Sequence, residues 1–125
     1  MKIRIKGNFI RYRLTQSEVR KLADSGKLEE ETSFGSGQNF YYALETKTGI
    51  SGLEADFKNG RITLYLPQEA AHAWPDEDRV GFENTVETIP GKSLYLLLEK
   101  DFVCLDEVAE DQSDNYPNPR NEKRD

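Results

Sequence analysis

The sequence predicts an α+β domain that consists mainly of antiparallel β-strands, with one helix near residues 16–25 and a short helix near residues 67–74. Two features predict the strands: apolar and polar residues alternate along several short runs, and tight-turn dipeptides separate some of these runs. Helix start signals at the two remaining segments predict the helices. We expect about six to eight strands in one strongly curved or barrel-like sheet.

The first predicted hairpin joins residues 2–6 to residues 9–14 through Gly7-Asn8, a dipeptide that suits a type II′ turn. A two-residue turn at this place sets Ile5 opposite Ile10 on an apolar face. The opposite face of the hairpin then gathers five basic side chains: Lys2, Arg4, Lys6, Arg11 and Arg13.

The first predicted helix begins with a capping box. Thr15 suits the N-cap position, and Glu18 stands three residues later, where its carboxylate can accept a hydrogen bond from the backbone of the cap. Val19 and Leu22 lie on one face of such a helix, and Gly26 is placed to end it. The helix is therefore expected to follow the hairpin directly and to present an apolar stripe to the core.

Four further strands are predicted between the two helices. Residues 27–34 and 40–47 flank a Gly-rich segment, and residues 53–58 and 61–66 flank Asn59-Gly60, which favours a type I′ turn. The register that this turn sets agrees with the apolar pattern, which supports the second hairpin. It pairs Phe57 with Ile62, Ala55 with Leu64, and Leu53 with Leu66.

The last part of the domain combines the short helix with a final hairpin. Pro67 is expected at the first helical position, which tolerates its missing N–H. Residues 80–88 and 92–105 flank a three-residue turn that ends at Gly91. Residues 94–98 are apolar on both faces, so this strand is expected in the centre of a sheet. The register pairs Val86 with Leu94 and Phe82 with Leu98.

The chain has 125 residues, the length of one ordinary domain. We expect residues 1–105 to form this domain and residues 106–125 to form an acidic tail with little regular structure. The sequence has no apolar run of membrane-spanning length and no signal-peptide core. The single Cys104, expected as a buried inert thiol, excludes an internal disulfide. These features favour a soluble, cytoplasmic, acidic protein.

Charge is distributed unevenly along the chain, whose net charge is −6. Residues 1–27 carry eight basic and two acidic residues, whereas residues 28–125 carry nine basic and 21 acidic residues. Arg4 opposite Arg11 is a like-charged pair across two strands, and such pairs destabilise a bare hairpin. The basic face therefore needs compensation, either from within the fold or from an anionic partner.

Both kinds of compensation remain open. Acidic residues on other predicted strands can pair with the basic face, which would make it structural. Alternatively, the face binds an anionic ligand such as phosphate or polyphosphate, or an acidic protein, through arginine forks. Nucleic acid is disfavoured, because the chain is acidic and has no recognition helix or RNA-binding motif. The candidate ligand-binding residues are Arg4, Lys6, Arg11 and Arg13, and the candidate internal partners are Glu29, Glu30, Glu31, Glu45, Glu54, Asp56 and Glu83.

Catalytic and metal-binding chemistry finds little support in the sequence. His72 is the only histidine, and no nucleophile is placed beside it. One Cys and one His cannot form an ordinary structural zinc site, and the acidic residues of the tail lack the spacing of a calcium loop. We therefore predict no catalytic residue, no metal site and no cofactor, and we favour a non-enzymatic module over an enzyme.

Five segments carry a distinctive pattern: residues 2–8, 11–19, 60–67, 99–105 and 114–119. Together they resemble a family of short bacterial proteins that has no assigned function. The resemblance covers nearly the whole chain and implies that the tail belongs with the domain. It implies no catalytic residue, because none is assigned in that family.

A second resemblance is to the triphosphate tunnel enzymes, which are antiparallel barrels with alternating Glu, Arg and Lys in the interior. Their Glu-x-Glu-x-Lys signature would fall on residues 2–6, which are Lys-Ile-Arg-Ile-Lys here, without the glutamates that would support metal-dependent hydrolysis. The sequence thus favours a binding or interaction module that recognises an anion or an acidic partner. The alternative is a small phosphate-ester or polyphosphate hydrolase of the tunnel type.

Overall fold

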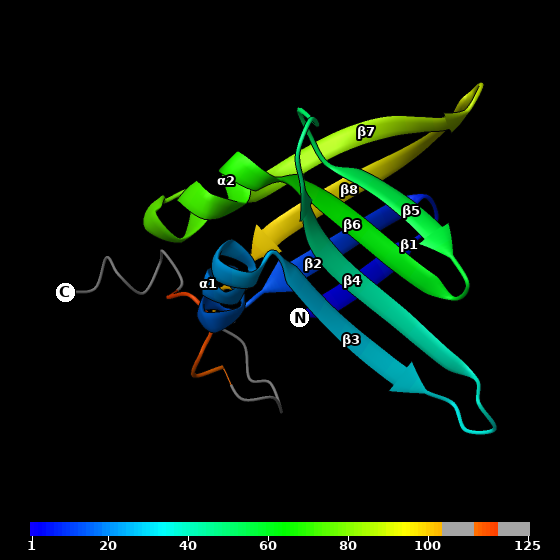
Figure 1. Cartoon of the computed structure of the whole chain (residues 1–125), viewed down its shortest axis with the longest axis horizontal. Coiled ribbons are helices and arrows are strands. Elements are labelled where there is room, and N and C mark those ends of the chain that lie inside the picture. Colours follow the sequence, from blue (N-terminus) through cyan, green and yellow to red (C-terminus); the bar gives the residue numbers. More distant parts are fainter. Residues whose placement is uncertain (104–111, 118–125) are drawn as a thin grey trace.

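The structure is a computed structural model that describes residues 1–103 and 112–117. Within these residues, eight strands form two four-stranded sheets, and two short helices lie together at one end of the strands (Figure 1). The predicted α+β class is confirmed. Cys104 lies outside the described residues, as do residues 106–111 and 118–125, which are most of the predicted tail.

Sheet A contains the first two and the last two strands of the chain. These are β1 (Lys2–Lys6), β2 (Phe9–Leu14), β7 (Gly81–Ile89) and β8 (Lys92–Lys100), in the spatial order β1-β2-β8-β7. The two outer pairs are antiparallel hairpins, and β2 pairs with β8 in parallel at the centre. The prediction that the last strand is central is therefore confirmed.

Sheet B repeats this topology with the four middle strands. These are β3 (Lys27–Ser33), β4 (Asn39–Lys47), β5 (Glu54–Lys58) and β6 (Arg61–Pro67), in the order β3-β4-β6-β5, with β4 parallel to β6. Each sheet is therefore two hairpins joined by a parallel pair. This arrangement corrects the expectation of one curved sheet, because the described strands form two mixed sheets and no closed barrel.

The hairpin registers agree with the sequence predictions. Arg4 lies opposite Arg11 and Ile5 lies opposite Ile10 in the first hairpin. One part of the β5–β6 prediction is wrong, because β5 begins at Glu54 and leaves Leu53 buried in the preceding loop. The other predicted pairs are all present: Phe57 with Ile62, Ala55 with Leu64, Val86 with Leu94, and Phe82 with Leu98.

Helix α1 (Gln16–Ser25) has the predicted bounds and the predicted start. The Glu18 carboxylate accepts a hydrogen bond from the backbone N–H of Thr15 at 2.9 Å. Gly26 ends the helix with a φ of 78°, a left-handed conformation that glycine adopts without steric strain.

Helix α2 (Gln68–Ala73) continues into the 3₁₀ turn η1 (Trp74–Asp76). The expectation that Pro67 occupies the first helical position is wrong, because Pro67 is the last residue of β6 and α2 begins at Gln68. Its backbone is still extended, with a ψ of 133°. The strand thus runs directly into the helix.

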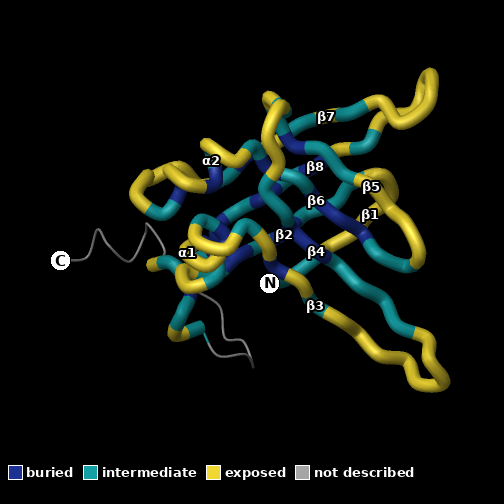
Figure 2. The backbone as a smooth tube through the Cα atoms, viewed as in Figure 1, coloured by how far each residue is buried: buried dark blue, intermediate teal, exposed yellow. Residues whose placement is uncertain are grey.

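The core lies between the two sheets and under the two helices, as the buried segments in Figure 2 show. The Tyr12 hydroxyl donates a hydrogen bond to the Ile62 carbonyl at 3.2 Å and so links sheet A to sheet B. Burial raises the pKa of this hydroxyl. The fully buried side chains include Tyr12, Leu14, Val19, Leu22, Leu44, Leu64, Leu66, Trp74, Leu96 and Leu98.

The described part of the tail, residues 112–117, contacts the body of the domain. The Tyr116 N–H donates to the Asp101 carbonyl at 2.8 Å, and the Val103 N–H donates to the Tyr116 carbonyl at 2.6 Å. At the start of α1, Asp114 accepts hydrogen bonds from the backbone N–H and the hydroxyl of Ser17. This segment therefore fastens the end of β8 to the start of α1.

Candidate functional site

The predicted basic residues lie on the outer face of sheet A, which points away from sheet B. The register explains this placement: Ile5 and Ile10 face the interior, so their neighbours Arg4 and Arg11 face outward. We call the five outward basic residues the basic strip; they are Lys2, Arg4, Lys6, Arg11 and Arg13.

Two carboxylates from the neighbouring central strand and its C-terminal end neutralise part of the basic strip. Glu99 Oε1 lies 2.9 Å from Arg11 Nε and 3.9 Å from Arg13 Nε. Asp101 is buried, and its Oδ2 atom lies 2.8 Å from Lys2 Nζ. Both carboxylates reach the strip because β8 runs parallel to β2 and sets Arg13 opposite Glu99.

The internal partners that the sequence suggested do not contact the basic strip. Glu29 instead pairs with Arg61, Glu54 pairs with Lys47, and Glu30 contacts the amino group of Met1. Sequence reasoning missed Glu99 and Asp101 because hairpin patterns do not reveal which hairpins lie side by side. Carboxylates within the fold therefore compensate part of the basic charge, but they are not the carboxylates that the sequence suggested.

Within residues 1–103 and 112–117, two carboxylates form ion pairs with the basic strip, and they pair with Lys2, Arg11 and Arg13. Arg11 has a close ion pair, whereas Arg4 and Lys6 form no ion pair with any described residue, and both side chains are exposed. The predicted anion-binding residues thus lie on one face of sheet A.

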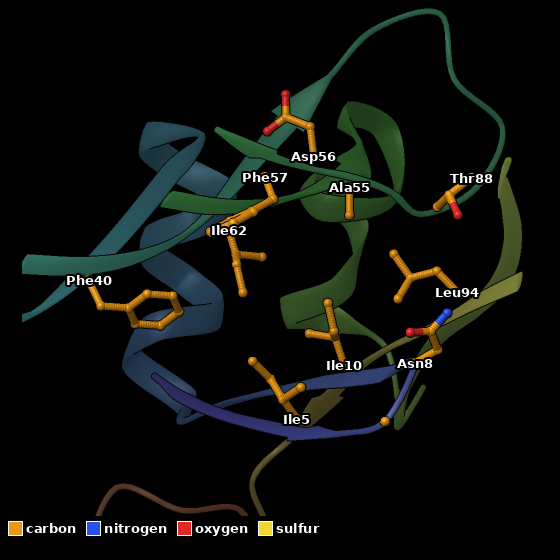
Figure 3. A pocket seen from close by; sticks show the side chains of 11 residues that line it. Ile5, Asn8, Ile10, Phe40, Ala55, Asp56, Phe57, Ile62, Thr88 and Leu94 are labelled. Carbon is orange, nitrogen blue, oxygen red and sulfur yellow. The ribbon is translucent and has the colours of Figure 1, made fainter. Parts of the chain in front are cut away.

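A second candidate site is a cleft between the two sheets, which sequence reasoning did not predict. It has a volume of 440 Å³, and its lining residues include Gly7 and Asn8 at the β1–β2 turn and Thr88 near the β7–β8 turn. Figure 1 shows that these turns lie at the end of the strands away from the two helices. Figure 3 shows side chains from both sheets around it. Most of them are apolar: Ile5, Ile10, Phe40, Phe57, Ile62 and Leu94.

The cleft exists because the helices cover only one end of the space between the sheets. At the open end, Ile5 is 52% exposed and Phe57 is 69% exposed, although both face the interior side of their strands. Each lies near the tip of its hairpin, beyond the reach of the opposite sheet. Sequence alternation predicts that these residues face inward, but it does not show that the space between the two sheets is open at the hairpin tips.

The polar groups of the cleft lie at its edge and carry no charge toward its interior. Asn8 and Thr88 contribute an amide and a hydroxyl. Asp56 is the one titratable residue in the lining, and Figure 3 shows its carboxylate pointing away from the hollow. The hydroxyl of Tyr65 donates a hydrogen bond to this carboxylate at 3.3 Å. The interior of the cleft is therefore apolar and uncharged.

Reactive side chains are not gathered at either site. His72 is exposed on α2 and does not line the cleft. Within the described residues, no group of three His, Cys, Asp or Glu side chains is placed to hold a metal ion.

Lys100 is a buried base near the helical end of the core, outside both candidate sites. Its ammonium group donates to the Glu77 carbonyl at 2.6 Å and lies 4.8 Å from the centre of the Tyr116 ring. Burial lowers the pKa of Lys100. Its contacts join β8, the segment after η1 and residues 112–117, which is a structural role.

Comparison with protein families matches residues 1–120 to a family of unknown function, DUF7009. The chain belongs to this family. The match spans both sheets and reaches into the tail, so the matched region of this chain contains the residues of the basic strip and of the cleft. Comparison with curated proteins and with solved structures found no match. None of the helices in the described part of the chain has the length and apolar content to span a membrane.

Proposed function

We propose that the chain is a non-enzymatic binding module that holds a small apolar molecule in the cleft between its two sheets. The observation that carries this proposal is the 440 Å³ hollow with apolar walls from both sheets. Ligand pockets in proteins commonly measure about 300–1,000 Å³ and combine apolar walls with a few polar groups.

The lining also indicates the chemistry of the ligand. Burial of an unpaired charge is strongly unfavourable, and no charged side chain points into the cleft. Asn8 and Thr88 can form hydrogen bonds with a neutral polar group at the edge. The ligand is therefore an uncharged molecule with an apolar body and one hydrogen-bonding end, such as a long-chain alcohol.

The hydrolase alternative gains no support from this geometry. A triphosphate tunnel requires basic and acidic side chains on the inner faces of the strands, whereas no basic residue lines the cleft. Arg4, Lys6, Arg11 and Arg13 lie on the opposite side of sheet A. Phosphoryl hydrolysis would need charge stabilisation at the reacting group, which the cleft does not offer.

Fluorescence of the neutral probe N-phenyl-1-naphthylamine tests the cleft. We expect the probe to bind the full chain, and Ala55→Phe to weaken binding by about tenfold or more, because the added ring fills the hollow. Decanol is expected to displace the probe better than decanoate or decylammonium. Ile89→Phe is the matched control, since Ile89 is 62% exposed and does not line the cleft. Equal binding by Ala55→Phe, with an unchanged Tm, would refute the proposal.

A second candidate function is the recognition of an acidic partner or an anion by the basic strip. The observation that favours it is the presence of Arg4 and Lys6, which have no ion pair with described residues. A ligand that binds the native state raises the Tm by mass action. We expect millimolar polyphosphate to raise the Tm at low ionic strength, and Arg4→Gln/Lys6→Gln to abolish the shift. A Tm that polyphosphate leaves unchanged would contradict an anion site.

A further inference from the structure

The outer face of sheet A carries a second charged strip, of the opposite sign. Glu83 and Glu87 lie on β7, both are exposed, and neither forms an ion pair with a described residue. We call them the acidic strip. Between the basic and acidic strips, β8 presents Tyr95, which is 53% exposed, and Leu97, which is half-buried. The face is therefore basic on one side, apolar in the middle and acidic on the other side.

One row across the sheet shows the order of these side chains. Arg4 pairs with Arg11, Arg11 with Leu97, and Leu97 with Glu83, from β1 through β2 and β8 to β7. Strands β2 and β7 are about 10 Å apart, twice the spacing of neighbouring strands, so direct contact between the two strips within one chain is unfavourable. In the described part of the chain, the two helices lie together at one end of the strands and pack against each other and against strands of both sheets (Figure 1).

We propose that two copies of the chain pair face to face through sheet A, about a two-fold axis parallel to the strands. Such an axis reverses the strand order but keeps each row at its level, so Arg4 of one copy meets Glu83 of the other. The two-fold axis makes this contact form twice, and Leu97 and Tyr95 become buried between the two contacts. This inference rests on the second candidate function and names its acidic partner as another copy of this chain.

Charge complementarity favours a second copy over an unrelated acidic protein. A uniformly acidic partner would satisfy Arg4 and Lys6 but would set like charges against Glu83 and Glu87. A partner that satisfies both strips must carry the same charges in the reverse order and at the same spacing. The two-fold image of sheet A has this property.

Sedimentation equilibrium of the full chain tests the pairing. We expect the wild type to sediment at twice the mass of one chain at low ionic strength, and added salt to weaken the dimer. Arg4→Glu and Glu83→Arg are each expected to sediment as monomers, because each sets like charges together twice. An equimolar mixture of the two variants is expected to form a mixed dimer, since both of its contacts join opposite charges. The double variant Arg4→Glu/Glu83→Arg is expected to dimerise for the same reason.

Control variants distinguish the pairing of two copies from the binding of an anion by the basic strip. Glu29→Arg, on the outer face of sheet B, is expected to leave the dimer mass unchanged. Circular dichroism and the Tm establish that each variant is folded. A monomeric wild type, or a dimer that persists in both single variants, would overturn the pairing. If a monomeric wild type still gains Tm with polyphosphate in an Arg4-dependent manner, the basic strip binds an anion and only the second-copy inference fails.

Discussion

The two sheets have the same topology but opposite ways of arranging charge on their outer faces. Sheet B places opposite charges side by side. Arg61 lies 2.5 Å from Glu29, Lys47 lies 3.3 Å from Glu54, and Lys27 lies 3.9 Å from Glu29. On sheet A, Arg4 and Lys6 of β1 and Glu83 and Glu87 of β7 form no ion pair with the residues that the structure describes. The same topology thus carries one face with opposite charges side by side and one face whose charges are paired only in part.

The two outer faces differ in whether their cations already have partners within the chain. On sheet B, the long cations also lie over aromatic rings, with Arg61 and Lys47 each 4.9 Å from the centre of Tyr41 and Tyr65 respectively. These contacts occupy the cations within the chain. On sheet A, Arg4 and Lys6 have no such partners among the described residues. The two outer faces therefore differ in their pattern of charge and not in their topology.

The largest expected effect concerns the shared core, where the two sheets should behave alike. Leu98 on β8 and Leu64 on β6 are both fully buried on central strands. Leu98→Ala and Leu64→Ala are each expected to lower the free energy of unfolding by about 2–5 kcal/mol, because each leaves a cavity. Urea unfolding measures both values, and Phe34→Ala, at a 73% exposed position, is the control. A loss confined to one sheet would mean that the sheets unfold separately.

A smaller effect concerns Lys100, which lies at the end of sheet A and has no counterpart on sheet B. Its side chain is buried, and burial lowers its pKa below the ordinary value of 10.5. Between the lowered pKa of the folded state and the ordinary pKa, Lys100 is protonated in the unfolded chain and deprotonated in the native state. The contribution of Lys100 to the free energy of unfolding therefore rises with pH in this range. We expect Lys100→Met to remove this rise while leaving any dependence at lower pH unchanged.

Urea unfolding at several pH values below 10 measures this effect. The upper limit matters because burial raises the pKa of Tyr12 above its ordinary value of 10.0. The native state then retains a proton that the unfolded chain loses, so Tyr12 lowers stability at higher pH. Parallel pH profiles for the wild type and Lys100→Met would show that Lys100 does not titrate differently on folding.

The smallest effect is expected on the neutralised face of sheet B. The hydrogen bond from Arg61 lowers the pKa of Glu29, but both side chains are near the solvent. Exposed ion pairs contribute little to stability. We expect Glu29→Gln to change the urea midpoint only slightly, and high salt to reduce the difference. Glu31→Gln is the matched control on the same strand. A large loss for Glu29→Gln would mean that this face is less solvated than it is in the structure.

Local features of the fold were predictable from the sequence because short-range chemistry determines them. Asn59-Gly60 specifies a tight turn, and the alternation around it then sets the register of Phe57 opposite Ile62. Thr15 and Glu18 likewise mark the start of α1. Turn type, cap and alternation act over a few residues, so they can be inferred without knowledge of distant strands.

The arrangement of the hairpins was not predictable in the same way. Nothing near Arg11 in the sequence indicates that β8 lies beside it, so the pairing with Glu99 could not be inferred. The cleft has the same origin. Ile5 and Ile10 are recognisable as inward-facing, but the hollow beside them depends on how two separate sheets diverge at their far ends. The basic strip was therefore predictable, whereas its partial neutralisation and the cleft were not.

The strands of the two sheets are also completed at different stages of synthesis. Every strand of sheet B lies between Lys27 and Pro67, so this sheet has all its partners before α2 is made. Strand β2 ends at Leu14, yet its central partner β8 begins only at Lys92. The edge of β2 that pairs with β8 therefore stays unpaired until the last strand has been synthesised. Such distant pairings slow folding and expose the edge to aggregation, so sheet A is expected to limit the rate at which the native domain forms.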